Sequence, residues 1–593
     1  MKTSADGVEF RSVYVPMRDG VRLAVDVWLP ADLGADERLP TIFTLTRYWR
    51  SYDLVDGRLD KQKSYQTAKF FVSRRYAFVL ADARGSGASF GTRPSEYSAD
   101  EIDDIGELVG WAARQPWSNG KVAATGTSYT GNTAFLSTVH GPSALKAVAP
   151  NSADFDVFRQ LMCPGGIPNT WMIGTWGASV SARDQNDFDK LVRLSTRPPP
   201  EEFLKNVRGV RPVDDDRDGS MLAAAVAEHD GNYNLAEDGF DASYSDAEAA
   251  TEAMALAASV YNYREAIERS RVPIFYRTGW QDAGTAEGAI SLFKTFSNPL
   301  RVTIGPWNHG MSSQADPYQP GEEAQPIPLK VKLSSVLSDV EHFVSDSKAA
   351  KPEMGVLEYF TLGENKWKTT REWPPTGTTM KRLYLVADGR LSEKLPTEES
   401  GHDTYHVDLD ASTGKYNRWH TQLGQPVHHP DRRDEDKRLL VYDSSALEED
   451  TEVTGTPEAS LFISSTAEDG AFFAYLEDVE PGGRVRLITE GCLRGLHRKL
   501  GDERPPYPMS GPYHTYKRRD AEPMVPGEVT ELRFSLFPIS VLFRQGHRIR
   551  LAIAGADRDT FEPVVRGEAP KIRVERNRLH ASSIELPLVT REP

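Results

Sequence analysis

The chain has 593 residues, too many for one compact domain, which predicts two to four domains. Hydrophobic residues make up 39% and charged residues 26%, and no apolar run approaches the roughly 20 residues of a membrane span, so we expect a folded protein with no membrane partner. The formal net charge of −16 repels phosphates and argues against nucleic acid as a partner.

The first ten residues have neither the apolar core nor the cleavage pattern of a signal peptide, which favours the cytoplasm. Cys163 and Cys492 are the only cysteines in the sequence. Two thiols so far apart make neither a disulfide framework nor a metal site, and we expect both to be idle or buried.

Strand-like and helix-like patterns alternate over the first 150 residues. An Asp-Gly turn at 19–20 separates two alternating runs, which is a hairpin signal. Short apolar runs, typical of buried parallel strands, follow at 41–47, 76–82, 122–126 and 145–150. Between the second and third of these runs, a helical pattern spans 100–115. This order predicts a parallel α/β sheet preceded by an antiparallel hairpin.

The pattern changes near Asn151. Helix-like segments such as 246–263 follow, without a further strand ladder, and we expect them to form a cap over the sheet. Strand-like runs then resume at 272–278 and 300–304, and from about residue 355 many short alternating strands predict a β-sandwich of the jelly-roll type. The expected division is an α/β domain in two parts, at 1–152 and 265–354, with a helical cap between them at 153–264 and a jelly-roll domain after them at 355–593.

A serine lies in a tight turn between the third of these runs and a helix-like segment, 132–139, in the sequence Gly-Thr-Ser-Tyr-Thr-Gly around Ser128. The nucleophile elbow of α/β-hydrolases has this strand–serine–helix context and needs small residues around the turn. Gly126 fits the position two before the serine. The usual glycine two after it is Thr130, and Gly131 comes one residue later. The segment predicts Ser128 as a nucleophile.

A serine hydroxyl needs a general base, and in this fold the acid and the histidine follow on loops after later strands. Asp282 and His309 each come shortly after a strand-like run, in that order. Of the competing histidines, His342 lies in a helix-like stretch and His140 precedes the acid. We therefore predict that His309 takes the Ser128 proton, that Asp282 orients the imidazole, and that water breaks down the acyl-enzyme.

The oxyanion of this reaction needs hydrogen-bond donors. The backbone N–H of Tyr129, the residue after the nucleophile, is one candidate. The loop after the run 41–47 has no glycine-rich stretch, so a side chain must supply the other, and the Tyr48 hydroxyl is the candidate. From the residues alone, a role as a hydrogen-bond donor and a role as a packed aromatic ring are equally expected for Tyr48.

The first segments of the cap contain four aromatic residues. Such residues pack a cap core, or they line an apolar acyl pocket if they face the elbow. We expect at least one of them to touch the site: Phe155, Phe158, Trp171 and Trp176.

Taken together, these motifs resemble the bacterial cocaine esterase family, which includes α-amino acid ester hydrolases and X-Pro dipeptidyl-peptidases. The resemblance covers nearly the whole chain and rests on four stretches, 17–21 (MRDGV), 82–91 (DARGSGASFG), 126–131 (GTSYTG) and 305–310 (GPWNHG). It implies a split α/β-hydrolase domain with a helical cap, a jelly roll, the Tyr48 hydroxyl in the oxyanion hole, no metal and no cofactor. It also implies that Asp82 and Arg84 buttress a structural loop near the site.

One departure from the family bears on the substrate. The amino acid ester hydrolases have acidic residues directly after the triad aspartate, which help to hold the substrate ammonium, whereas Ala-Gly-Thr follows Asp282 here. This favours an ester or amide of a neutral acyl group, although Asp154 and Asp156 in the cap are further carboxylates.

Several alternatives stay open. An X-Pro dipeptidyl-peptidase or an acyltransferase would use the same triad, and an inactive hydrolase scaffold that binds a ligand is the alternative of another class. The expected partner is a small-molecule ester or amide, and homodimerisation stays open.

Overall fold

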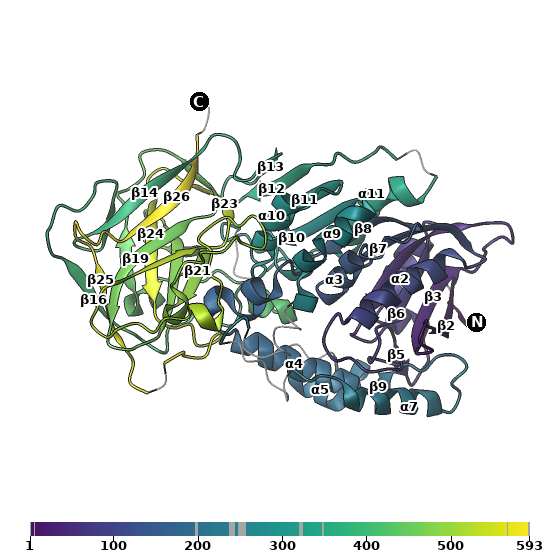
Figure 1. Ribbon diagram of the computed structural model, residues 1–593. Coiled ribbons are helices and arrows are strands. Elements are labelled where there is room, and N and C mark those ends of the chain that lie inside the picture. The colour runs from purple at the N-terminus through teal and green to yellow at the C-terminus, as the bar shows by residue number, and fades with distance from the viewer. Residues whose placement is uncertain are drawn as a thin grey trace.

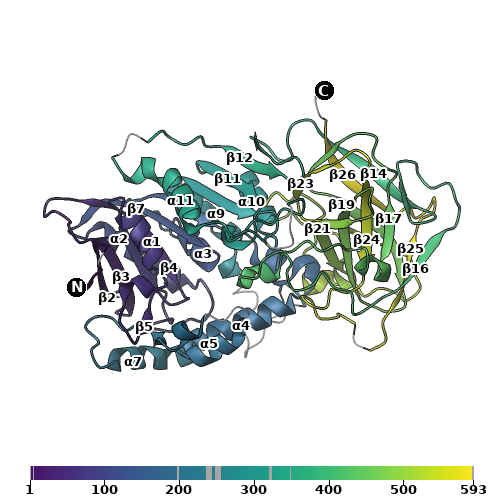
Figure 2. The same cartoon turned by 180° about the vertical axis from the view of Figure 1, so that it is seen from behind.

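The computed structural model describes residues 2–4, 6–195, 200–235, 243–246, 256–319, 324–346, 349–565 and 567–590. An α/β part carries the N-terminus at one end of the molecule, and a β-sandwich carries the C-terminus at the other (Figure 1). A row of cap helices runs along one side of the α/β part toward the sandwich, in both Figure 1 and Figure 2: α7 (Ser220–Glu228), α5 (Phe188–Leu194) and α4 (Thr170–Asp184).

The first sheet has eleven strands in the described residues, in the order β1-β2-β3-β6-β4-β7-β8-β10-β11-β12-β13. All neighbours from β6 to β12 pair in parallel, and antiparallel pairs flank them. The strands are β1 (Lys2–Thr3), β2 (Val8–Pro16), β3 (Arg22–Pro30), β4 (Leu39–Thr46), β6 (Ala77–Asp82), β7 (Ser118–Thr127), β8 (Leu145–Asn151), β10 (Ile274–Gly279), β11 (Leu300–Gly305), β12 (Val356–Thr361) and β13 (Lys366–Thr370).

Helices cover both faces of this sheet, which is why its central strands are continuously apolar rather than alternating. All six residues of β6 are buried, for example. One face packs on α1 (Tyr65–Val72) and α11 (Leu329–Val344). The other packs on α2 (Ala99–Ala113), α3 (Tyr129–Leu136) and α10 (Thr285–Thr295). This is the α/β-hydrolase arrangement predicted from the sequence.

The cap is helical in most of its described part, with α6 (Glu201–Leu204) in addition to the row of helices, and α9 (Arg264–Ser270) leads from the cap back into the α/β part. It also contains β9 (Val207–Val210), which pairs with β5 (Tyr52–Leu54) although no strand was expected there. A four-residue strand is too short to show a periodic pattern. Residues 247–255 of the helix-like segment 246–263 lie outside the described residues.

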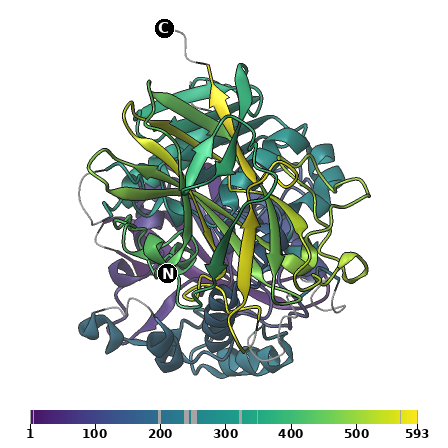
Figure 3. The ribbon, with the colours of Figure 1, turned by 90° about the vertical axis from the view of Figure 1, so that its left-hand side faces the viewer.

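The second sheet has thirteen strands in the described residues and folds over as a sandwich, which faces the viewer in Figure 3. Its strands are β14 (Thr378–Val386), β15 (Arg390–Ser392), β16 (His402–His406), β17 (Leu440–Asp443), β18 (Thr451–Gly455), β19 (Glu458–Ser465), β20 (Ala471–Val479), β21 (Val485–Arg494), β22 (Thr530–Ser535), β23 (Ile539–Phe543), β24 (Arg548–Ala554), β25 (Lys571–Glu575) and β26 (Ser583–Val589). The first sheet extends to Thr370, beyond the expected boundary at 355, because β12 pairs in parallel with β11.

Among the helices in the described ranges, none combines the length and the apolarity that a bilayer crossing requires.

Candidate active site

Ser128 occupies a strained turn between β7 and α3. Its backbone angles are φ 61° and ψ −130°, a region that residues with a Cβ rarely adopt and that costs about 1–3 kcal/mol. The Ser128 N–H donates to the carbonyl of Asn151 at 3.0 Å, which ties the turn to β8. Such a turn lifts the serine side chain off the strand at the carboxyl edge of the sheet.

The small residues around Ser128 are required by close contacts. A Cβ on Gly126 would lie 2.3 Å from the carbonyl oxygen of Thr130, and one on Gly131 would lie 2.7 Å from that of Asn151. Thr130 fits where a glycine is more usual because its hydroxyl accepts from the Thr127 N–H at 2.7 Å and donates to the Thr127 carbonyl at 2.8 Å. The threonine thus closes the turn by itself.

Asp282 and His309 meet at the same edge. They follow β10 and β11, which pair in parallel over their full length, so their loops emerge side by side. The imidazole Nδ1–H of His309 donates to Oδ1 of Asp282 at 2.8 Å. Gly310 lies against Thr127, since a Cβ there would come 2.7 Å from the threonine methyl group. The histidine loop therefore packs beside the strand that ends at Ser128.

Asp282 is fully buried and has two further donors. The Gln422 amide donates to Oδ1, the oxygen that also accepts from His309, and the Thr278 hydroxyl donates to Oδ2 at 3.3 Å. The backbone N–H of His309 donates to the Thr421 hydroxyl at 3.3 Å. Thr421 and Gln422 belong to η7 (His420–Leu423), between β16 and β17 of the sandwich. No motif in the sequence marks this turn, so neither residue was expected at the site.

The environment of His309 favours its charged form. Burial lowers the pKa of the imidazole, but the charge of Asp282 and its hydrogen bond act in the opposite direction and prevail, so the pKa lies above the ordinary value. A general base that must carry a proton during the reaction is stabilised by this arrangement.

Tyr48 lies in the loop two residues after β4, and its ring contacts Tyr129 of the elbow. Its ring packs edge-on against the Tyr129 ring, with 5.8 Å between centroids. The indole N–H of Trp176 donates to the Tyr48 hydroxyl oxygen at 3.0 Å, which leaves the hydroxyl proton available for another acceptor. Burial raises the pKa of Tyr48, so the hydroxyl stays protonated well into the alkaline range.

The backbone amide of Tyr129 is the second expected oxyanion donor. Tyr129 is the first residue of α3, where N–H groups have no acceptor within the helix. Trp49 beside Tyr48 also has a positive φ of 62°, so backbone strain marks both loops that carry expected donors.

The four cap aromatics divide into two pairs. Phe155 and Phe158 are buried against rings of the cap, α10 and the sandwich, among them Tyr507 and Tyr516. Trp176 contacts Tyr48, as described above. Trp171 stacks on His420 of η7 with 3.8 Å between ring centroids. Of the four predicted pocket residues, Trp176 thus contacts an expected oxyanion donor and Trp171 contacts η7, whereas the contacts of Phe155 and Phe158 are with packed rings.

Asp154 and Asp156 have different surroundings. Asp156 is buried, accepts from the Tyr507 hydroxyl at 2.8 Å and pairs with Arg159 at 3.1 Å, which makes it part of the packing between cap and sandwich. Asp154 is half-buried, and burial raises its pKa to about 7, against the charge of His309. Asp154 therefore lies within electrostatic reach of the predicted base.

The stretch 82–91 forms the structural loop that the sequence implied. Asp82 accepts from the Arg50 backbone N–H and from its guanidinium, both at 2.7 Å, and Arg84 pairs with Asp104 at 2.8 Å. A Cβ on Gly87 would lie 2.3 Å from the Asp82 carboxylate, so the loop closes tightly over it.

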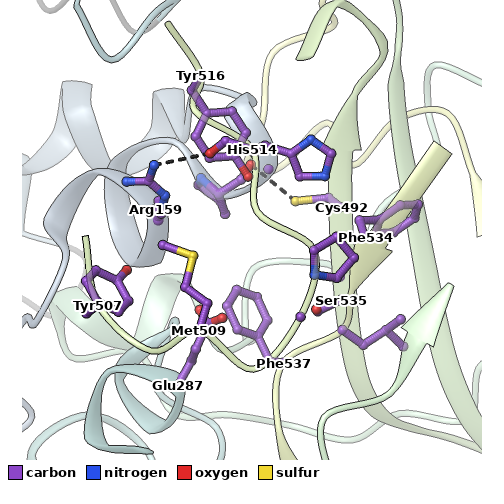
Figure 4. A pocket seen from close by; sticks show the side chains of 16 residues that line it. Arg159, Glu287, Cys492, Tyr507, Met509, His514, Tyr516, Phe534, Ser535 and Phe537 are labelled. Carbon is purple, nitrogen blue, oxygen red and sulfur yellow. Dashed lines mark hydrogen bonds between the residues drawn. The ribbon is translucent and has the colours of Figure 1, made fainter. Parts of the chain in front are cut away.

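A small hollow of about 80 Å³ lies where the cap, α10 and the sandwich meet (Figure 4). Arg159 lies over the Tyr516 ring there, 5.3 Å from its centroid, and Glu287 of α10 faces the same space, where burial raises its pKa to about 7. The thiol of Cys492 donates to the Pro164 carbonyl at 3.3 Å. Neither Ser128 nor His309 lines this hollow, so it is separate from the candidate active site.

Comparison with known proteins places the chain in a family. A family model for X-Pro dipeptidyl-peptidases of the S15 family matches residues 19–311. A Mycobacterium bovis protein provisionally named a serine esterase is 40% identical, and the match spans 98% of this chain and 96% of that protein. The chain belongs to the S15 family of serine hydrolases. All three predicted triad residues of this S15 hydrolase lie within the matched region.

A second family model, for the X-Pro dipeptidyl-peptidase C-terminal non-catalytic domain, matches residues 351–581. In this S15 hydrolase that region supplies Gln422, the further donor to Asp282, so it contributes to the candidate site.

Other relatives show how wide the chemistry of the fold is. The cocaine esterase of Rhodococcus sp. (strain MB1 Bresler) is 25% identical, over 98% of both chains. An aminopeptidase structure from a marine sediment Thaumarchaeota archaeon matches with a TM-score of 0.71 and 19% identity, over 100% of this chain and 98% of that one. Since esterases and aminopeptidases share the architecture, the fold alone does not choose the substrate of this S15 hydrolase.

Proposed function

We propose that this S15 hydrolase is an esterase that cleaves carboxylic esters through an acyl-enzyme intermediate on Ser128. The observation that carries the proposal is the hydrogen bond from His309 to the buried carboxylate of Asp282, beside a serine held in a strained elbow. This combination of nucleophile, base and orienting acid is the one that activates a serine hydroxyl.

The proposed reaction is the two-step acyl-enzyme route of serine hydrolases. The Ser128 oxygen attacks the ester carbonyl while Nε2 of His309 takes the hydroxyl proton, because Nδ1 already donates to Asp282. The negative oxygen of the tetrahedral intermediate accepts hydrogen bonds from the Tyr48 hydroxyl and the Tyr129 N–H. His309 then gives its proton to the leaving alcohol, and a water molecule repeats the sequence to release the carboxylic acid.

Labelling and turnover of matched variants test this proposal. Wild-type protein is expected to bind one fluorophosphonate group, read by intact mass, and to hydrolyse p-nitrophenyl acetate and butyrate. Ser128→Ala should lose both properties, and Ser143→Ala, at an exposed serine on the same domain, should keep both. Turnover that survives in Ser128→Ala would refute the assignment. Supplying an alcohol or amine acceptor in the same assay tests for acyl transfer, and a chromogenic X-Pro amide tests for peptidase activity.

A second candidate is a substrate with an α-amino group, which Asp154 favours. The Asp154 carboxyl lies within electrostatic reach of His309, the predicted base. A substrate ammonium beside this carboxyl would lower the pKa of Asp154 from about 7 and form a charge-assisted hydrogen bond with it. If this candidate holds, Asp154→Asn raises KM at least tenfold for the p-nitrophenyl ester of alanine and leaves that of propionate unchanged. An equal effect on both esters would assign Asp154 to the general electrostatics of the site.

A further inference from the structure

The loop that carries His309 has to bridge three strand spacings to reach the nucleophile. In the sheet order β7-β8-β10-β11, Ser128 follows β7 and His309 follows β11 (Figure 1). Neighbouring strands lie about 4.8 Å apart, so the ends of β7 and β11 are separated by roughly 14 Å. This distance exceeds the reach of a histidine side chain. The backbone of the loop must therefore lie back over the ends of β10 and β8.

The passage over β10 depends on a close approach to a glycine. Gly279 is the last residue of β10, and a Cβ on it would lie 1.9 Å from the carbonyl oxygen of Trp307 in the histidine loop. The same oxygen accepts a hydrogen bond from the Gln281 N–H at 3.2 Å. The loop backbone thus crosses directly over the end of β10, where a larger side chain would push it outward.

Two contacts hold the loop beyond β10. The N–H of Gly310, the residue after His309, donates to the Ser152 hydroxyl at 3.0 Å. Gly310 also packs against Thr127, as described above. Ser152 directly follows β8 and Thr127 ends β7, so the two contacts hold the loop over the strands nearest to Ser128.

Ser152 is also tied to the turn that carries the nucleophile. The carbonyl of Asn151, the residue before it, accepts the Ser128 N–H at 3.0 Å, and the Ser152 N–H donates to the Arg277 carbonyl of β10 at 2.8 Å. Ser152 is 1% exposed, so water does not compete for its hydroxyl. Residues 151 and 152 therefore hold the elbow through the backbone and the histidine loop through a side chain.

The backbone of Ser152 is strained. Its φ of 47° lies in the left-handed region, which residues with a Cβ rarely adopt. A glycine would adopt this φ more readily but would offer no hydroxyl to Gly310. Strained residues persist where the surrounding structure holds them in place, and they cluster at functional sites. A strained residue with a buried hydroxyl on the histidine loop indicates a role in placing the base.

We propose that Ser152 is a positioning residue, which holds the histidine loop over the ends of β8 and β7 and thereby sets the distance between Nε2 of His309 and the Ser128 hydroxyl. The inference rests on the proposed acyl-enzyme mechanism, in which Nε2 takes the serine proton. Asp282 orients the imidazole through Nδ1, whereas Ser152 acts on the backbone that carries the ring. Because a misplacement of about 1 Å can lower a rate by about 10², we expect loss of the Ser152 hydroxyl to lower kcat by about 10–10².

Two variants separate the hydroxyl from the strain. Ser152→Ala removes the acceptor and keeps the strain, whereas Ser152→Gly removes the acceptor and relieves the strain. With p-nitrophenyl butyrate, both variants should lose at least about tenfold in kcat at little change in KM. Ser152→Gly should nevertheless unfold at a higher urea concentration than Ser152→Ala. If Ser152 were merely structural, activity would follow stability, so wild-type kcat in Ser152→Gly would overturn the proposal.

The pH profile gives an independent readout. The acid limb of kcat/KM should keep its wild-type midpoint in both variants, because the burial of His309 and its hydrogen bond to Asp282, which together set its pKa, are left in place. A midpoint that moves would mean that Ser152 acts on the charge of the imidazole rather than on its position, and would also overturn the proposal.

Ser312→Ala is the matched control on the same loop. Ser312 is exposed, and its hydroxyl donates to the Asn308 side chain at 2.9 Å without joining the loop to the sheet, so its loss should leave kcat unchanged. Wild-type kcat in both Ser152 variants, in a protein that Ser128→Ala inactivates, would refute the role of Ser152 and leave the proposed function standing. A wild type that is neither labelled nor active would instead refute the acyl-enzyme mechanism, and with it any role of Ser152.

Discussion

Replacing Tyr48 with phenylalanine removes one hydroxyl group and leaves the ring packed on Tyr129. The Trp176 indole N–H occupies a lone pair of the Tyr48 oxygen at 3.0 Å, so the hydroxyl proton is the part that remains for the substrate. A hydrogen bond from Trp176 also polarises the hydroxyl and strengthens it as a donor. Removal of one oxyanion donor typically lowers kcat by about 10²–10³, and we expect Tyr48→Phe to do the same with KM little changed.

The change has a second consequence that a stability assay detects. Trp176 is 8% exposed, and in Tyr48→Phe its N–H has lost the acceptor it uses in the wild type. An unsatisfied buried donor costs about 1–3 kcal/mol, so the variant should unfold at a lower urea concentration. Trp176→Phe is the matched control, since it removes the N–H and keeps the Tyr48 hydroxyl.

Steady-state kinetics on p-nitrophenyl butyrate compare the two single variants and the double variant. We expect the loss in Trp176→Phe to be smaller than in Tyr48→Phe, and the double variant to have the kcat of Tyr48→Phe, because Trp176 acts through the hydroxyl. A kcat for Tyr48→Phe within about threefold of wild type would refute the role of Tyr48 as a donor. A change confined to KM would mean that the hydroxyl binds ground state and transition state equally.

The remaining predictions concern the base and its acid. The kcat/KM of wild type should fall as the pH drops through the pKa of His309, because only the neutral ring accepts a proton. The midpoint of this fall should lie above pH 6.5, since the charge of Asp282 raises the pKa of His309. A midpoint at or below pH 6.5 would contradict that charge effect. Asp282→Asn should lower kcat about 10⁴-fold and shift that limb to lower pH, measured on the residual activity. Gln422→Leu removes a donor from the same carboxylate and should lower kcat at least tenfold at unchanged KM, since hydrogen bonds to charged groups contribute about 1.5–3 kcal/mol. Wild-type kcat in Gln422→Leu would show that the sandwich only encloses the site.

Through Gln422, the C-terminal domain contributes a hydrogen bond to the candidate active site. A region that matches a domain described as non-catalytic places an amide on the carboxylate that orients the predicted base. Arg418 of the same segment donates to the Trp280 and Ala283 carbonyls, each at 2.9 Å, on both sides of Asp282. The loop that carries the acid is thus held by the sandwich as well as by its own strand.

The sequence by itself determined the elements whose signals are local. Buried parallel strands appear as short apolar runs, and the elbow appears as a serine between a strand and a helix with Gly126 at the tight position. The order of Asp282 and His309 after successive strands was readable for the same reason, because parallel strands bring their carboxyl ends to one edge.

Tertiary structure decided the contacts between segments far apart in the chain. Gln422 lies 140 residues from Asp282, and a lone glutamine in a polar turn carries no pattern that identifies its partner. The separation of the tryptophans from Phe155 and Phe158 and the pairing of Tyr48 with Trp176 depend in the same way on how layers pack. Hydrophobic periodicity indicates which face of a helix or strand is buried, but it does not indicate which other part of the chain packs on that face.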